Sequence, residues 1–295
     1  MKFKHWIVFI LLGLIWSTSF LWIKIGVQEI GPMALVAFRT LFGAITVLVI
    51  ALYQKEQWPR DRKTWRNFAI LGPTSLAIPF FLISWGELTI DSTVPLFTIV
   101  IAHFWLSDDK ITLQKALGLS IGFGGVVLLL SRDLSTSAHN SVVGQGAVIL
   151  AAIFYAWSAV FARRVTQHVA GLARGAAPLI TATIFMWITA PFIEKPFQIP
   201  TLPLTWMAAL WLGILGTGLA VLMFYYLIHE IGPTRATLVT YLSPIGGVFF
   251  GVVFLHENLS WQLLMGTFLI VGSLVVVNWK PAERVEHKQV ALKSR

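Results

Sequence analysis

Long apolar blocks, separated by short polar loops, fill almost the whole chain. A helix needs about 20 apolar residues to cross the hydrocarbon core of a bilayer, and most of the blocks have that length. The pattern therefore predicts an all-α integral membrane protein with ten transmembrane helices. We expect these helices at residues 6–25, 33–53, 68–88, 91–106, 113–130, 144–162, 176–193, 206–228, 236–255 and 262–279.

The composition indicates that lipid is the main solvent of this chain. Hydrophobic residues make up 57% and charged residues 12%, whereas about a quarter of a soluble domain is charged. The net charge of +9 is carried mainly by the loops, which favours membrane orientation over a nucleic-acid partner as its explanation. The absence of cysteine excludes disulfides and thiolate catalysis.

The distribution of basic residues predicts the orientation of the chain. If residues 1–5 are cytoplasmic and ten spans follow, all but four of the 22 Lys and Arg residues lie in cytoplasmic segments or the tail. The four exceptions are Lys24, Arg39, Arg132 and Lys195. Basic residues resist translocation, so we expect both termini in the cytoplasm.

The second half of the chain repeats a pattern of the first. Leu106-Ser-Asp-Asp and Leu255-His-Glu-Asn each lie eleven residues after a proline, Pro95 and Pro244, which gives a period of about 149 residues. Each is followed by a second apolar run that carries Gly-x5-Gly. Such internal repeats are typical of transporters built around the interface between two halves.

An odd number of spans in each half has a structural consequence. Two similar tandem halves of five spans must insert with opposite orientations, so the sequence predicts two inverted five-helix repeats. We expect the first repeat at residues 1–135 and the second at 136–280, followed by a disordered cytoplasmic tail at 281–295.

Five motifs follow one another along the chain. They are Gly13-Leu-Ile-Trp-Ser-Thr-Ser-Phe20 with Lys24, Phe38-Arg39, Pro95-Leu-Phe with Phe104-Trp-Leu-Ser-Asp-Asp109, Gly118 through Leu130, and Tyr241-Leu-Ser-Pro244 through Glu257. Taken in this order, they resemble the motifs of the EamA family of the drug/metabolite transporter superfamily. The resemblance covers nearly the whole chain, with one EamA-like repeat in each half. It implies ten spans, a multi-pass position in the inner (plasma) membrane and movement of small organic solutes, often outward. Similar chains include exporters of amino acids and other metabolites.

The chain departs from this family pattern before the fourth span. Ala77 precedes Pro95 by 18 residues, whereas Ala220 precedes Pro244 by 24 residues. Residues therefore look missing around 89–92, and the apolar run 93–106 gives only about 21 Å of helix against a hydrocarbon thickness of about 30 Å. A role that the family assigns to the start of span four therefore does not carry over to this chain directly. Whether the protein transports at all also depends on this shortened span.

Intramembrane charges and deep aromatic rings are the candidates for solute contacts, because both are typical of cavity linings. The candidate substrate-binding residues are Trp16, Arg39, Tyr155, Trp157 and Tyr241. Arg39 lies about seven residues into the second span. It either contacts an anion, a carboxylate or Glu87, or it serves as a packing or snorkelling arginine.

Lys24, Glu87 and His103 are candidates for gating or ion coupling. Lys24 and Glu87 end their spans on the outer side, and His103 lies inside the fourth span. Structural roles are the alternatives: snorkelling for Lys24, an interfacial position for Glu87 and packing for His103. Pro95 and Pro244 correspond across the repeat and are expected to kink their helices beside the solute pathway.

The leading hypothesis is a secondary transporter that exports small organic solutes, such as amino acids or related metabolites, by alternating access. Its expected partners are the solute and the lipid bilayer, and Gly118-x3-Gly122 and Gly247-x3-Gly251 allow close packing within the chain or in a homodimer. The sequence has no Gly-x4-Gly-Lys-Ser/Thr and no His-Glu-x2-His, so we expect no cofactor, no metal and no enzymatic activity. The alternatives are a non-transporting sensor or scaffold and a membrane-embedded enzyme.

Overall fold

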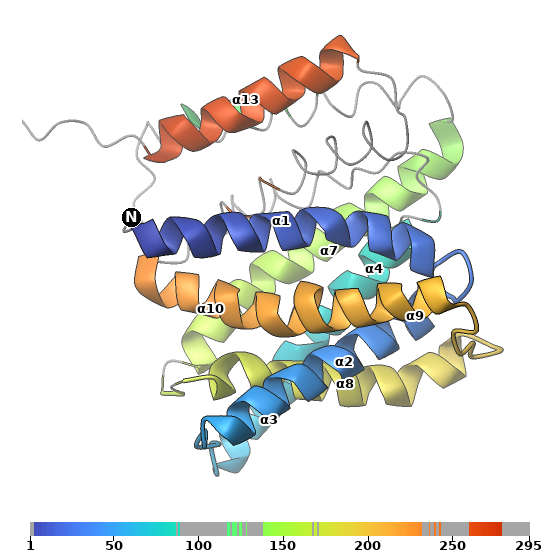
Figure 1. Cartoon of the computed structure of the whole chain (residues 1–295), viewed down its shortest axis with the longest axis vertical. Coiled ribbons are helices and arrows are strands. Elements are labelled where there is room, and N and C mark those ends of the chain that lie inside the picture. The colour runs from blue at the N-terminus through green and yellow to red at the C-terminus, as the bar shows by residue number, and fades with distance from the viewer. Residues whose placement is uncertain are drawn as a thin grey trace, which may run out of the picture.

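The computed structural model describes most of the chain as helix (Figure 1). It covers residues 3–86, 88, 138–166, 168–169, 171–231 and 260–278, with isolated residues from 117 to 128 and at 236, 239 and 242. No strand occurs in these segments. The helices are α1 (Phe3–Gly26), α2 (Pro32–Tyr53), α3 (Arg62–Gly72), η1 (Pro73–Ala77), α4 (Ile78–Gly86), α7 (Ala138–Val165), α8 (Ala173–Ile193), α9 (Pro203–Leu210), η3 (Trp211–Leu219), α10 (Ala220–Ile231) and α13 (Trp261–Asn278).

Five described helices are long and apolar enough to cross a membrane. They are Phe3–Gly26, Pro32–Tyr53, Arg62–Gly86, Ala173–Ile193 and Pro203–Ile228. They confirm the apolar helices predicted at 6–25, 33–53, 68–88, 176–193 and 206–228. Helices α7 and α13 cover the predicted spans 144–162 and 262–279. The span predicted at 91–106 lies outside the described residues, as do most of 113–130 and 236–255.

The helix of the third predicted span begins at Arg62, six residues before the predicted span at 68–88. Asp61 is its N-cap, and the side chain of Asp61 accepts a hydrogen bond from the backbone N–H of Thr64 at 2.7 Å. A capped N-terminus extends a helix into a polar segment that an apolar pattern alone leaves out.

Two of the long helices contain π-helical segments. Pro73 begins η1 inside the third span, where its ring nitrogen has no N–H for the ordinary helical bond. The second segment, η3, covers Trp211-Leu-Gly-Ile-Leu-Gly-Thr-Gly-Leu219. The two segments occupy comparable places, because each lies between two α-helical parts of one long helix.

The packing pattern is the same when the halves are exchanged. Helices α2 and α8 pack against each other, and each also packs against the π-containing helix of the other half. Helix α1 packs against α9, η3 and α10, while α7 packs against α3, η1 and α4. Figure 1 shows α1 beside α9 and α10 and α2 beside α8. Each half therefore contributes helices that lie against the other half.

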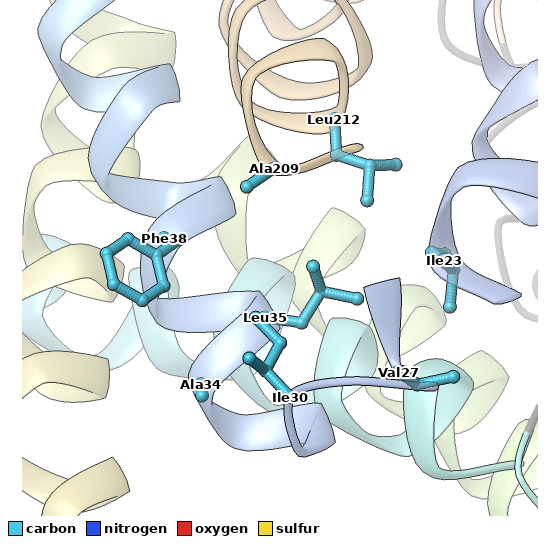
Figure 2. Close-up of a cluster of buried hydrophobic side chains, with 8 residues drawn as sticks. All are labelled: Ile23, Val27, Ile30, Ala34, Leu35, Phe38, Ala209 and Leu212. Atoms are coloured by element: carbon cyan, nitrogen blue, oxygen red, sulfur yellow. The ribbon is translucent and has the colours of Figure 1, made fainter. Parts of the chain in front are cut away.

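The N-terminal part of α2 lies at the centre of this arrangement. Every residue from Pro32 to Thr40 is buried. One hydrophobic cluster joins α1, α2, α9 and η3 (Figure 2). Its members are Ile23, Val27, Ile30, Ala34, Leu35, Phe38, Ala209 and Leu212. Because the faces of α2 are covered by neighbouring helices along this stretch, a polar residue there meets protein and not lipid.

Helices α2 and α8 cap each other through carboxylates. Glu194 follows α8, and its carboxylate accepts hydrogen bonds from the backbone N–H groups of Met33 at 3.4 Å and Ala34 at 2.8 Å, at the start of α2. Glu56 follows α2 and accepts a bond from the N–H of Ala173 at 3.3 Å, at the start of α8. The first N–H groups of a helix lack intrahelical partners and carry positive partial charge, so each carboxylate stabilises the opposite helix.

A second pair of loop contacts relates the halves in the same way. Glu29, in the loop after α1, accepts hydrogen bonds from the backbone N–H groups of Thr201 at 2.6 Å and Leu202 at 3.0 Å, just before α9. His168, in the loop after α7, lies with its Nε2 2.6 Å from the hydroxyl of Thr64, at the start of α3. In both halves the loop after the first helix therefore contacts the start of a helix of the other half.

Candidate functional site

Arg39 places a guanidinium group inside the helix bundle. At 1.5 Å per residue, α2 is about 33 Å long and Arg39 lies about 11 Å from its N-terminal end. The residue is only 4% exposed. An arginine near the middle of a transmembrane helix costs about 3 kcal/mol on an insertion scale. Its neighbours must therefore offset much of this cost.

Two hydrogen bonds tie Arg39 to η3 of the other half. Its Nε donates to Thr217 Oγ1 at 2.7 Å, and its Nη2 donates to the carbonyl oxygen of Gly216 at 3.3 Å. In an α-helix that carbonyl would accept from the N–H of Ala220, but in η3 this N–H bonds the carbonyls of Leu215 and Thr217. The π-helical winding thus leaves the Gly216 carbonyl able to accept from the arginine.

Glycine allows α2 and η3 to approach closely beside Arg39. A Cβ at Gly43 would lie 2.9 Å from Thr217 Cγ2 and 3.2 Å from the carbonyl oxygen of Gly213. The first separation is shorter than real Cβ contacts and the second is tighter than most of them, so larger residues at 43 would push η3 away. The close approach keeps Thr217 within hydrogen-bond distance of Arg39.

Two aromatic residues also lie near the guanidinium. Arg39 Cζ lies 3.8 Å from the centre of the Phe80 ring of α4, a cation–π contact. The phenol of Tyr155, on α7, lies within electrostatic range of Arg39 and packs against the cluster that contains Phe80. The site therefore brings together α2, α4, η3 and α7.

Two enclosed serine hydroxyls lie close to this site along the chain. Ser84 follows Phe80 by one helical turn on α4, and Ser158 follows Tyr155 by about one turn on α7. The hydroxyl oxygens of both are buried without a hydrogen-bond partner, and among the described residues no other side-chain nitrogen or oxygen atom shares this state. An unpaired buried hydroxyl costs about 1–3 kcal/mol, so the seam between α4 and α7 holds unfavourable free energy.

The structure brings some of the predicted site residues together and separates others. Arg39 and Tyr155 share one site. Trp16 packs against Phe224 of α10, with ring centroids 5.4 Å apart. Trp157 is 46% exposed and stacks on Phe161 at 4.9 Å. The roles predicted for Trp16 and Trp157 stay predictions.

Of the remaining predicted site residues, the structure describes Lys24 alone. Lys24 lies in the last turn of α1 and is partly exposed. The other five predicted residues lie outside the described residues. They are Glu87, Pro95, His103, Tyr241 and Pro244. A described neighbour of Tyr241, Leu242, contacts α1, where the Ser17 hydroxyl donates to the Leu242 carbonyl at 3.1 Å.

Sequence reasoning missed the partners of Arg39, which are Thr217, Gly216 and Phe80. The signal for the first two was the run Gly213-x2-Gly-Thr-Gly218, since closely spaced glycines in a span indicate a close helix approach. No pattern signals a π-helical segment that redirects a carbonyl. Phe80 resembles every other apolar residue of its span.

The loop carboxylates outside the spans are held in their charged form. The hydroxyl of Thr201 donates to Glu29 at 2.5 Å, and with the N–H groups of the same segment it lowers the pKa of Glu29 to about 2. The backbone N–H of Thr64 likewise lowers the pKa of Asp61 from its ordinary value. These groups serve as helix caps at neutral pH.

Comparison with known proteins assigns the family. The model of the EamA-like transporter family matches residues 4–131 and again residues 142–279. The chain belongs to the EamA-like transporter family. The resemblance drawn from the sequence motifs is thereby confirmed, and the chain is a membrane transporter by family.

Two relatives of this chain are named as transporters. The chain is 26% identical over 278 residues to "Uncharacterized inner membrane transporter YedA" of Escherichia coli K12, covering 90% of this chain and 88% of the relative. It is 22% identical over 268 residues to "Uncharacterized transporter YoaV" of Bacillus subtilis 168, covering 87% and 90%. These names support an inner-membrane transporter and specify no solute.

A solved crystal structure shares the fold of this chain. The TM-score is 0.72 at 18% sequence identity, with 94% of this chain and 98% of the solved chain covered. At this identity the likeness shows the fold alone.

Proposed function

We propose that this EamA-like transporter is a secondary carrier that exports small organic solutes, such as amino acids or related metabolites. The observation that carries the proposal is the buried guanidinium of Arg39, which belongs to the first half and is hydrogen-bonded to η3 of the second half. Charged groups inside a membrane protein are costly and mark solute pathways. A charge held between two halves lies where a carrier binds its solute.

In this proposal the two halves are inverted repeats of five spans each, at residues 1–135 and 136–280, with both termini in the cytoplasm. Three observations support it. The family model matches twice along the chain, the helix contacts keep their pattern when the halves are exchanged, and α2 and α8 cap each other. Rocking of one half against the other would open the site to alternate sides of the membrane.

Reconstituted vesicles test the proposal. Purified protein is placed in liposomes loaded with an unlabelled solute, and counterflow of the labelled solute is measured over a panel of amino acids, purines and cationic drugs. We expect accelerated movement of at least one solute, and loss of it in Arg39→Ala or Trp16→Ala. Exposed residues provide matched controls in Arg60→Ala and Trp261→Ala.

Movement of no solute by the folded protein would contradict the proposal and favour a non-transporting relative. Turnover of a lipid-linked substrate in the same vesicles would instead favour a membrane-embedded enzyme. Gel filtration of the purified protein tests whether it forms a homodimer.

A further inference from the structure

The guanidinium of Arg39 has hydrogen-bond capacity that its neighbours do not use. A guanidinium carries five N–H donors, and the bonds to Thr217 and Gly216 use two of them. No described residue accepts from Nη1. Among the described residues, the side-chain atoms that are fully enclosed and lack a hydrogen-bond partner are Ser84 Oγ and Ser158 Oγ. Nη1 also lacks a partner but is not one of these enclosed atoms. Nη1 is therefore not fully enclosed by the protein.

The positive charge of Arg39 has no countercharge in the described part of the chain. The ion pairs there join Lys4 and His5 to Glu230, at the far end of α1 and α10. The described carboxylates of Glu29, Glu56, Asp61 and Glu194 act at helix starts in the loops. Burying a cation is costly unless an anion pairs with it, so a carboxylate brought to Arg39 by a solute would offset part of this cost.

The neighbours hold the guanidinium in a fixed position with its free edge available. Phe80 covers one face, and η3 fixes Nε and Nη2. A planar guanidinium held in this way suits a carboxylate, which accepts two parallel N–H bonds. The phenol of Tyr155 adds a hydroxyl donor on the α7 side.

We infer that the transporter recognises its solute through a carboxylate group, which binds the Arg39 guanidinium beside Tyr155. This inference rests on the proposed carrier function and names its substrate class. Amino acids and other organic acids belong to this class, whereas purines and organic cations do not. A solute carboxylate at Arg39 would also contact both halves, because α2 and η3 share the guanidinium.

Direct binding tests the inference without transport. The melting temperature of the purified protein is measured with acetate, benzoate and N-acetyl-leucine, and with the neutral amide of each. We expect stabilisation by at least one acid and not by its amide, and loss of that stabilisation in Arg39→Gln. Arg39→Lys should bind more weakly than the native chain, because lysine keeps the charge without the planar pair of donors.

Tyr155→Phe keeps the ring and removes the hydroxyl, which provides a second variant if Arg39→Gln fails to fold. Loss of one hydrogen bond to a charged group predicts about tenfold weaker binding of the carboxylate. Ile153→Val, at an exposed position of the same helix, is the control and should bind normally. Equal stabilisation by acids and amides, or by none of the acids, overturns the inference.

Two further results separate the inference from the proposed function. Counterflow of purines or cations that is undiminished in Arg39→Gln overturns the inference and leaves the carrier standing. Carboxylate binding at Arg39 with no counterflow of any solute overturns the carrier function alone.

A charge swap tests whether the partner of Arg39 belongs to the chain itself. If Arg39→Glu combined with Glu87→Arg restores the native behaviour, the partner of Arg39 is a carboxylate of the chain and the inference is wrong.

Discussion

The carboxylate of Glu194 accepts a 2.8 Å hydrogen bond from the backbone N–H of Ala34, 160 residues earlier in the chain. Glu56 makes the corresponding bond to Ala173 at the opposite end of the α2–α8 pair. Each helix of this pair is thus tied at its start to the residues that follow the other helix. The two π-containing helices pack against this pair, and α1 and α7 pack in turn against the π-containing helices.

The contact between Gly31 and the Glu194 carboxylate predicts that substitutions at these two positions have coupled effects on stability. A Cβ at Gly31 would collide with the Glu194 carboxylate, although the backbone there has φ −66° and suits any residue. Glu194→Ala should lower the free energy of unfolding by about 1 kcal/mol, the usual cost of a lost cap. Gly31→Ala should also destabilise, but little in the Glu194→Ala background.

Reversible unfolding in mixed micelles measures this double-mutant cycle. Additive effects would contradict the collision, since residues in contact are coupled and separate sites are not. Arg60→Ala, at an exposed loop position, controls for the loss of a charged side chain.

Glu29 predicts a pH dependence of stability. Its pKa is about 2 in the folded chain, against an ordinary value of 4.5, chiefly because of the Thr201 hydroxyl. A lowered folded pKa gives a contribution that is complete above pH 4.5 and is lost as the pH falls through about 2. The difference in melting temperature between the native chain and Glu29→Gln should therefore be constant at neutral pH and shrink across this window.

Thr201→Val removes the hydroxyl that is the principal hydrogen-bond donor to Glu29, so the pKa of Glu29 in the folded chain should rise. The pH range over which the melting difference shrinks should then become narrower. A melting difference that stays constant down to pH 2 would contradict the role of Glu29 as a charged cap.

Thr217→Val tests the bond between the halves. Valine has nearly the same shape but no acceptor, so the buried Nε–H of Arg39 would lose its partner. We expect destabilisation by about 1–3 kcal/mol together with slower counterflow. Thr217→Ser restores the hydroxyl and should recover most of both, whereas equal behaviour of the two variants would exclude the hydrogen bond as the cause.

The enclosed hydroxyls of Ser84 and Ser158 predict that their removal does not destabilise the protein. Alanine at either position removes an unpaired buried oxygen, so Ser84→Ala and Ser158→Ala should be neutral or stabilising by about 1 kcal/mol. Ser17→Ala is the matched control and should destabilise, because the Ser17 hydroxyl donates to Gly13 and Leu242. Destabilisation by all three substitutions would show that Ser84 and Ser158 have partners in the membrane.

The apolar pattern predicted the existence of helices well and their ends less well. Burial in lipid requires long uninterrupted apolar runs, so α2 could be predicted to within about a residue. The helix of the third span begins with Arg62 and Lys63, because the side chain of Asp61 caps it there. An apolar pattern does not predict this start, because these residues are polar. Ends depend on caps and tertiary contacts, which a hydropathy pattern does not record.

The candidate site was only partly predictable for a similar reason. The cost of burying a charge singled out Arg39, and its position deep in a predicted span selected Tyr155. Their neighbours Phe80 and Thr217 come from segments that lie far from residue 39 in the sequence, and only the packing of the two halves brings them together. The inter-half caps by Glu194 and Glu56 depend on the same packing.

Single-cysteine labelling tests the central claim, that the two halves cross the membrane in opposite orientations. The chain has no native cysteine, so each introduced thiol is unique. Gln57, in the loop after α2, and Gln198, in the loop after α8, are both exposed and provide a matched pair. In intact cells, an impermeant maleimide should label Gln198→Cys directly and Gln57→Cys only after permeabilisation, whereas labelling of both from the same side would contradict the inverted arrangement.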